Sequence, residues 1–244
     1  MRWPGRSAGA PGVTPQGRGR FPGFDVLGEV PRWDEVTAGV VLRRLGPPRP
    51  LRFFTEDEEA TAAALFDRLL DQDGEPRVPV LAMVDERLTE NETDGWHYAD
   101  MPPDREAWHR TLRHLDEDAL ERFGRRFGEL GVDEQGALVQ AVQDRSGGDW
   151  HGLPATHVWS LWTRYAATAF YAHPWAWNEI GFGGPAYPRG YKNLGVDARE
   201  GWEVPERGGL DPVPWGDRKE AARDRHARTV VGSRPKGVGK GAGR

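Results

Sequence analysis

The sequence predicts an all-α protein: a compact bundle of about six helices with long irregular Gly/Pro-rich arms at both ends. Through the middle of the chain, apolar residues recur at spacings of three and four, the period of an amphipathic helix, and alternating strand patterns are sparse. The ends are rich in Gly and Pro, which interrupt helices. We therefore expect an irregular arm over residues 1–50, a helical domain over 51–191 and an irregular basic arm over 192–244.

The first helix is predicted to begin at Thr55. Thr55 and Glu58 have the spacing of a capping box, in which side chains and backbone N–H groups at a helix start pair reciprocally. An apolar face follows at helical spacing, and the helix ends near residues 71–74. A second helix is expected over about 78–89. Ahead of these, residues 36–42 are compatible with one strand or one helical turn.

Two helices are expected between Asp104 and Gly131. Asp104 can cap the first of them, and Asp116 can start the second, which ends at Gly131. A shorter helix then begins at Asp133 and breaks at residues 146–148.

The last helix has the most regular pattern. Seven apolar residues between Val158 and Phe170 follow the three- and four-residue spacing without a gap, which also favours a core position for Trp162. Pro154 fits the first turn of this helix, and Pro174 ends it. No later helix is predicted, apart from a weak pattern over residues 217–229.

Composition excludes several classes of function. The chain has no cysteine, so disulfides, thiolate metal sites and cysteine nucleophiles are ruled out. Its net charge of −5 combines +4 in residues 1–24 and +7 in residues 218–244, which leaves −16 for residues 25–217. An acidic body argues against nucleic-acid binding. No apolar run is long enough to span a membrane, and no export signal is visible, so the sequence alone predicts a cytoplasmic location.

The seven histidines require a test for a metal or acid–base site. His109 and His114 are five residues apart, and His151 and His157 are six apart, so neither pair has the spacing of two ligands on one helix face. We therefore predict no catalytic, cofactor-binding or metal-binding residue. The alternative is a stand-alone enzyme with a His/carboxylate metal site between helices, which would use His151, His157 and His173. Metal analysis and an assay without any partner distinguish the two.

An aromatic segment rich in Gly and Pro follows the last helix, at residues 170–185. Trp175 and Trp177 are expected to lie outside any helix. Because Tyr and Trp are favoured where one protein buries against another, this segment is predicted to be a docking surface. A further alternative is a structural protein whose arms exchange between protomers, which light scattering at several concentrations would reveal.

Three blocks also carry a family resemblance. The first is residues 53–58, the second lies within residues 108–138, and the third joins residues 170–174 with Asn178 and residues 180–185. In this order they resemble the gluconate 2-dehydrogenase subunit 3 family, the small subunits of membrane-associated flavoprotein sugar dehydrogenases. The chain departs from the family pattern at Trp175-Ala176-Trp177, where the family tends to have a glycine pair.

The resemblance implies a non-catalytic small subunit that binds a flavin-dependent (GMC-type) sugar or sugar-acid dehydrogenase subunit and supports its folding or maturation. It implies FAD in that large subunit and no cofactor in this chain, and a cytochrome c subunit is a third member of many such complexes. It also implies a periplasmic, membrane-associated location, often reached through a twin-arginine signal, which this sequence does not show.

On this account the partner-binding residues belong to the aromatic segment and to the tyrosines that follow it. Tyr171, Trp175, Trp177 and Phe182 would be the anchors, and Asn178 would satisfy backbone groups of the loop. The full set is Phe170, Tyr171, His173, Trp175, Trp177, Asn178, Phe182, Tyr187 and Tyr191.

Overall fold

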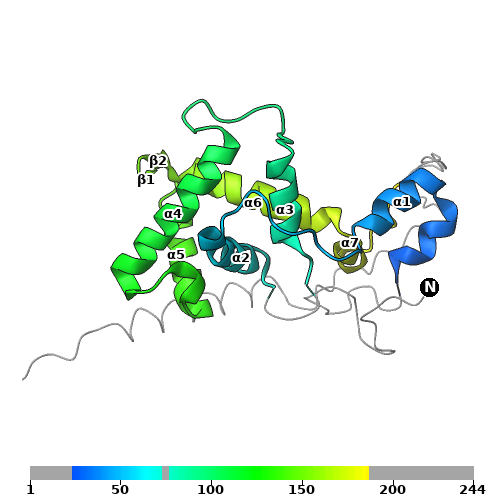
Figure 1. The fold of residues 1–244 in the computed structure, drawn as a ribbon, viewed down its shortest axis with the longest axis horizontal. Helices are drawn as coiled ribbons and strands as arrows, with labels where there is room; N and C mark the ends of the chain where they lie inside the picture. Colours follow the sequence, from blue (N-terminus) through cyan, green and yellow to red (C-terminus); the bar gives the residue numbers. More distant parts are fainter. Residues whose placement is uncertain (1–23, 73–76, 187–244) are drawn as a thin grey trace, which may run out of the picture. The chain divides into compact units, whose positions relative to one another are not determined.

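The computed structural model describes residues 24–72 and 77–186, and these residues confirm the all-α class (Figure 1). None of the helices in these two ranges combines the length and the apolar character needed to cross a bilayer. The predicted C-terminal arm lies outside the described residues and stays a prediction. In chain order the elements are η1 (Val26–Arg32), α1 (Glu35–Arg43), α2 (Glu56–Leu70), α3 (Val80–Thr89), α4 (Asp104–Phe123), η2 (Phe127–Glu129), α5 (Val132–Asp144), β1 (Asp149–Trp150), β2 (Leu153–Pro154), α6 (Ala155–Ala172) and α7 (Pro174–Ile180).

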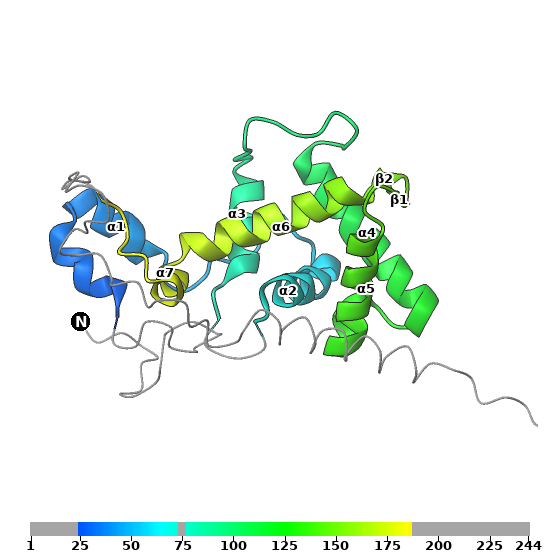
Figure 2. The ribbon, with the colours of Figure 1, turned by 180° about the vertical axis from the view of Figure 1, so that it is seen from behind.

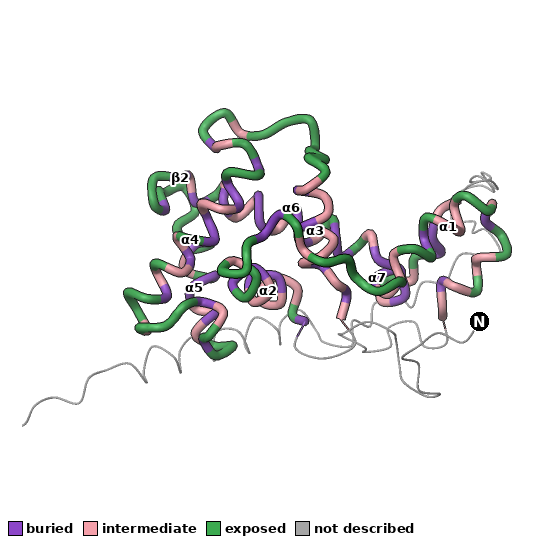
Figure 3. The backbone as a smooth tube through the Cα atoms, viewed as in Figure 1, coloured by how far each residue is buried: buried purple, intermediate pink, exposed green. Residues whose placement is uncertain are grey.

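Helix α6 is the central element of the main core. It contacts α2, α3, α4 and α5, and Figure 2 shows it running from the β1–β2 hairpin to α7. Burying each large apolar side chain contributes about 1.5–3 kcal/mol, so its apolar face is a major source of stability. Buried residues lie on the facing sides of these helices (Figure 3). The predicted face of α6 is buried throughout and consists of Val158, Leu161, Trp162, Tyr165, Ala166, Ala169 and Phe170.

Helix α2 begins as predicted, and Glu58 forms its half of the capping box, because its Oε2 accepts from the backbone N–H of Thr55 at 3.0 Å. It ends at Asp71, which takes the left-handed conformation (φ 56°). The neighbouring η2 packs closely on it, because a Cβ atom on Gly128 would lie 2.8 Å from the backbone carbon of Ala60. Only a residue without a side chain allows this approach of the two backbones.

The prediction of two helices between Asp104 and Gly131 is wrong, because α4 is continuous from Asp104 to Phe123. Asp116 lies in the middle of α4 and not at a helix start. Its carboxylate accepts hydrogen bonds from Thr61 Oγ1 (2.8 Å) and from the backbone N–H of Phe127 (2.9 Å). Asp116 thus accepts from a backbone N–H of another element, as an Asp at a helix N-cap accepts from a backbone N–H of its own helix.

The expectation of an irregular arm over residues 1–50 is wrong for Val26–Arg32 and Glu35–Arg43, which form η1 and α1. Asp34 is the N-cap of α1, and its Oδ1 accepts from the backbone N–H of Thr37 at 2.6 Å. These two helices belong to a second, smaller core that consists of Val26, Trp33, Val41 and Trp177.

A two-residue turn joins β1 to β2, which pair antiparallel through Trp150 and Leu153. His151 and Gly152 form this turn, and both have positive φ (52° and 76°). Positive φ at both central residues is the signature of the type I′ hairpin turn, so the position of His151 at the tip is fixed by the backbone.

Candidate functional site

The junction between α6 and α7 contains the aromatic segment that the sequence singles out. The expectation that Trp175 and Trp177 lie outside any helix is wrong, because residues Pro174–Ile180 form α7. Pro174 ends α6 as predicted, and it is also the first residue of α7, where its fixed φ is compatible with a helix start. Gly181 ends α7 in the left-handed conformation (φ 68°).

His173 connects the two helices. It is the C-cap of α6 and the N-cap of α7, and its Nδ1 accepts a hydrogen bond from the backbone N–H of Trp175 at 3.3 Å. Only 2% of the residue is exposed. Burial lowers the pKa of His173 to about 4, so the side chain is neutral at physiological pH. A neutral ring is what the cap requires, because only an unprotonated nitrogen can accept the Trp175 N–H.

Asn178 of α7 binds the N-terminal helices of the same chain. Its Oδ1 accepts from the backbone N–H of Val26 at 2.7 Å, and its Nδ2 donates to Asp25 Oδ1 at 3.3 Å. Arg44, at the end of α1, adds a bond from its Nη1 to the carbonyl oxygen of Ala172 (2.7 Å). Asn178 therefore satisfies backbone as expected, but the backbone belongs to η1 and not to the loop.

The glycine-rich loop after α7 also packs on this chain. Gly184 has φ 78°, and a Cβ atom there would lie 2.4 Å from the indole ring of Trp33. The loop backbone thus rests directly on Trp33, within reach of the small core that Trp177 completes. Much of the aromatic segment is accordingly used to hold η1 and α1.

Two of the predicted partner-binding residues are exposed on this junction. Tyr171 is 51% exposed and Phe182 is 38% exposed. Both adjoin Trp177, since its Nε1 donates to the Tyr171 carbonyl oxygen (2.6 Å) and its ring meets the Phe182 ring edge to face at 5.5 Å. Trp175 is half-buried, and Tyr187 and Tyr191 lie outside the described residues. The other four are buried within the chain: Phe170, His173, Trp177 and Asn178.

A comparison with protein families matches the family model described as gluconate 2-dehydrogenase subunit 3 to residues 56–184, more than half of the chain. The chain belongs to the gluconate 2-dehydrogenase subunit 3 family. The match begins at the first residue of α2 and ends at Gly184, the glycine that rests on Trp33. Comparisons with curated proteins and with solved structures gave no significant match. A family of dehydrogenase subunits implies that this chain has protein partners.

In this member of the gluconate 2-dehydrogenase subunit 3 family, the histidines of the alternative metal site do not come together. His157 lies in the first turn of α6, where its Nδ1 donates to Asp100 Oδ1 at 2.8 Å. His173 follows the last residue of the same helix, about 24 Å further along at 1.5 Å per residue. A site composed of His151, His157 and His173 is therefore excluded by the geometry.

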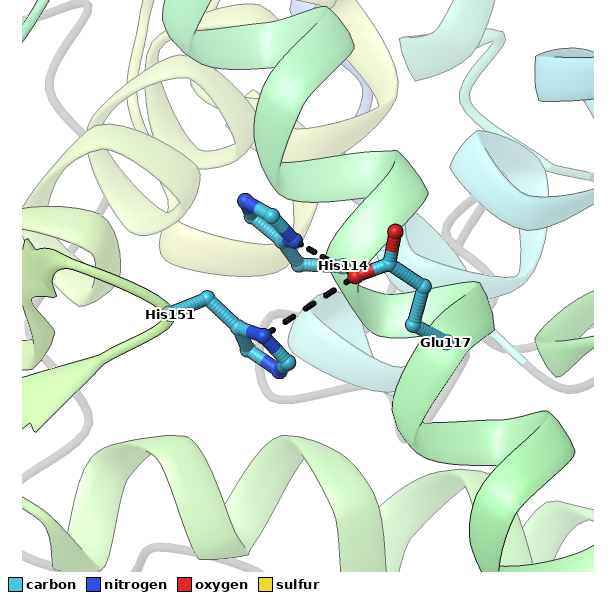
Figure 4. Close-up of side chains that lie close together, drawn as sticks. All are labelled: His114, Glu117 and His151. Atoms are coloured by element: carbon cyan, nitrogen blue, oxygen red, sulfur yellow. Dashed lines mark hydrogen bonds and ion pairs between the residues drawn. The ribbon is translucent and has the colours of Figure 1, made fainter.

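A different group of residues can offer three metal-ligand atoms, and within the described ranges it is the one such group. It consists of His114, Glu117 and His151, whose ligand atoms all lie within 4.8 Å of one another (Figure 4). The hydrogen bond from His114 holds the pKa of Glu117 below its usual value, which keeps this carboxylate ionised. Sequence spacing alone does not reveal the group, because His151 comes from a hairpin far along the chain from α4.

Proposed function

We propose that this chain is a non-catalytic accessory subunit that binds the large, flavin-dependent (GMC-type) subunit of a sugar or sugar-acid dehydrogenase and supports its folding or maturation. The observation that carries the proposal is the family match, which extends from α2 to the end of the α6–α7 junction. In this proposal FAD and the chemistry of oxidation belong to the large subunit, this chain contributes no redox cofactor, and a cytochrome c subunit is a further partner.

The exposed aromatic pair on the junction supports a docking role. Tyr171 and Phe182 offer large apolar surfaces to solvent. The Phe182 ring packs edge to face on the buried indole of Trp177, and the Tyr171 ring packs on buried Phe170, while the Tyr171 carbonyl oxygen accepts from Trp177 Nε1. Aromatic side chains on a rigid base lose little conformational freedom on binding, which favours them as anchors of an interface. We therefore assign the primary contact with the large subunit to Tyr171 and Phe182.

The outer face of α1 is a candidate extension of this contact. Val36 and Val40 are one helical turn apart, and they are 77% and 38% exposed. The bond from Arg44 to Ala172 and the bond from Val26 to Asn178 hold the N-terminal helices on the junction. In this proposal the large subunit covers both the aromatic pair and this face of α1.

The test is a double substitution, Tyr171→Ser with Phe182→Ser, in the full chain co-expressed with the large subunit. Truncating an aromatic anchor typically costs on the order of 2 kcal/mol or more, so we expect association to weaken by at least about 30-fold. Pull-down yield, the dissociation constant of the purified pair and the FAD content of the large subunit measure the effect.

A matched control is Trp96→Ser. Trp96 is also an exposed aromatic residue, at 49%, but it lies in the loop between α3 and α4. This variant should bind the large subunit as the unmodified chain does. Equal binding by the double variant, with its thermal unfolding unchanged, would show that the docking surface lies elsewhere.

A further inference from the structure

The β1–β2 hairpin tip lies against α4, where the two elements bring histidines and carboxylates together (Figure 4). His114 and Glu117 are three residues apart on α4, which places their side chains on one face of the helix. His114 Nδ1 donates to Glu117 Oε2 at 2.8 Å, and His151 Nδ1 lies 3.9 Å from the same oxygen. One carboxylate oxygen therefore lies near a nitrogen of each imidazole.

These separations are close to those of a coordination shell. Zinc binds imidazole nitrogen and carboxylate oxygen at about 2.0–2.2 Å, so neighbouring ligands of a tetrahedral ion lie roughly 3.3 Å apart. The distance from His114 Nδ1 to Glu117 Oε2 must therefore increase by about half an ångström, and the distance from His151 Nδ1 to the same oxygen must decrease by a similar amount. Side chains that are partly exposed can make such shifts, and the exposed fractions are 15% for His114, 50% for Glu117 and 29% for His151.

Asp118 already holds His151 in the state that a metal ligand needs. An ionised carboxylate only accepts hydrogen bonds, so His151 Nε2 carries the proton that it shares with Asp118 Oδ1 at 2.6 Å. In the neutral ring this leaves Nδ1 with a free electron pair on the side of Glu117. Asp118 is itself fixed, because its Oδ2 accepts from Trp150 Nε1 at 2.8 Å. A carboxylate behind a histidine is the usual outer support of a metal-binding imidazole.

The hairpin backbone adds a second restraint. The type I′ turn sets His151 at φ 52°, and Arg110 Nη2 of α4 donates to the His151 carbonyl oxygen at 3.3 Å. The backbone of His151 is thus held by α4, the helix that also carries His114 and Glu117.

We propose that His114 Nδ1, Glu117 Oε2 and His151 Nδ1 bind a divalent transition-metal ion of the Zn²⁺ class. Two imidazole nitrogens and one carboxylate oxygen suit such an ion, and the exposed side of Glu117 leaves the remaining positions to water. The ion would join the hairpin to α4 and would fix the start of α6, which follows β2 directly. This role is structural and independent of the large subunit, so it stands or falls separately from the proposed function. With such an ion, metal content alone does not separate the accessory subunit from the stand-alone enzyme, and the assay without any partner is the test that does.

Binding requires two local changes. The His114 and His151 rings are stacked nearly parallel, with centroids 4.4 Å apart, and they must turn apart to aim both nitrogens at one ion. The ion also replaces the proton on His114 Nδ1, and the neutral ring then carries its proton on Nε2. That nitrogen is buried without a hydrogen-bond partner, and the ion also breaks the His114–Glu117 hydrogen bond, which lowers the affinity by about tenfold or more. We therefore expect a dissociation constant for Zn²⁺ in the micromolar range, weaker than that of a preformed site.

The experiment is a titration of the full chain, stripped with a chelator and free of any affinity tag, with Zn²⁺ in a calorimeter and with Co²⁺ by visible absorption. We expect one ion per chain and a rise in the unfolding temperature at saturating Zn²⁺. In the variant His151→Asn this binding should weaken at least tenfold, because the ligand is lost while Asn is well suited to a type I′ turn. Asp118→Asn should weaken it by about 10–100-fold through misorientation of His151.

The matched control is His157→Asn, which removes a partly exposed histidine that is also paired with an aspartate but lies outside this group. This variant should bind Zn²⁺ as the unmodified chain does. The proposal is wrong if the chain binds no Zn²⁺ at micromolar concentration. It is equally wrong if His151→Asn binds as tightly as the unmodified chain, or if His157→Asn abolishes the binding.

Discussion

Replacing Asp85 by Ala is expected to lower the free energy of unfolding by about 3–5 kcal/mol. Asp85 lies on α3 and is 2% exposed. Its Oδ1 accepts from the backbone N–H of Arg52 at 2.8 Å, and its Oδ2 accepts from those of Phe53 and Phe54 at 2.8 and 2.9 Å. One carboxylate thus satisfies three consecutive donors that lead into α2. Without it, the two buried donors of Phe53 and Phe54 are left unsatisfied at a cost of about 1–3 kcal/mol each, and the partly buried donor of Arg52 also loses its partner.

Thermal or urea unfolding followed by circular dichroism measures this loss. For a chain of this size, we expect the unfolding temperature to fall by about 10 °C. The matched control is Glu86→Ala, one residue further along α3. Glu86 forms an exposed ion pair with Arg49 at 2.6 Å, which is worth about 1 kcal/mol at most. Equal stability of the two variants would show that the three hydrogen bonds do not hold the segment before α2.

Acidification is expected to remove about 3 kcal/mol of stability through His173 alone. Its pKa is about 4 in the folded chain, against a usual value near 6.5 once the ring is exposed. Between these values the unfolded chain binds a proton that the folded chain excludes, so the free energy of unfolding decreases as the pH falls. The contribution is complete above about pH 6.5 and is lost progressively between about pH 6.5 and pH 4.

The variant His173→Asn separates this effect from that of the many carboxylates, which titrate over a similar pH range. Asn also accepts hydrogen bonds at a helix start, so it can replace the cap on Trp175 without titrating. We expect the stability advantage of the unmodified chain over this variant to shrink by about 3 kcal/mol from pH 7 to pH 4. A difference that stays constant over this range would mean that His173 is not buried in its neutral form.

Local signals were sufficient for most helices of the main core. The capping box at Thr55 and the unbroken apolar face of α6 both determine their elements through residues that are close in sequence. The continuous α4 could not be recognised, because the cap-like Asp116 serves the distant backbone of Phe127. For α7, Pro174 and Gly181 are local signals of a helix start and a helix end, but a proline that follows a helix predicts by itself only the end of that helix.

Contacts between residues far apart in the sequence account for the other features that the sequence did not predict. The helices η1 and α1 are held by Asn178 and Trp177, more than 130 residues later, so residues 24–46 alone show little of their order. The same distance in sequence explains why the aromatic segment, predicted as a surface for another protein, largely covers this chain's own N-terminal helices. The His114–His151 group depends likewise on a turn that brings a hairpin to α4.

The central claim is that this chain is the accessory subunit of a flavoprotein dehydrogenase. The most direct measurement is to purify the full chain from its own organism under native conditions and to determine the mass, the flavin content and the sugar-oxidising activity of what elutes. We expect a complex with one large FAD-containing subunit per chain. The complex should oxidise a sugar, this activity should be absent from the small chain alone, and formation of the complex should require Tyr171 and Phe182. A chain that elutes alone, or that oxidises a sugar in the absence of any flavoprotein, would contradict the account.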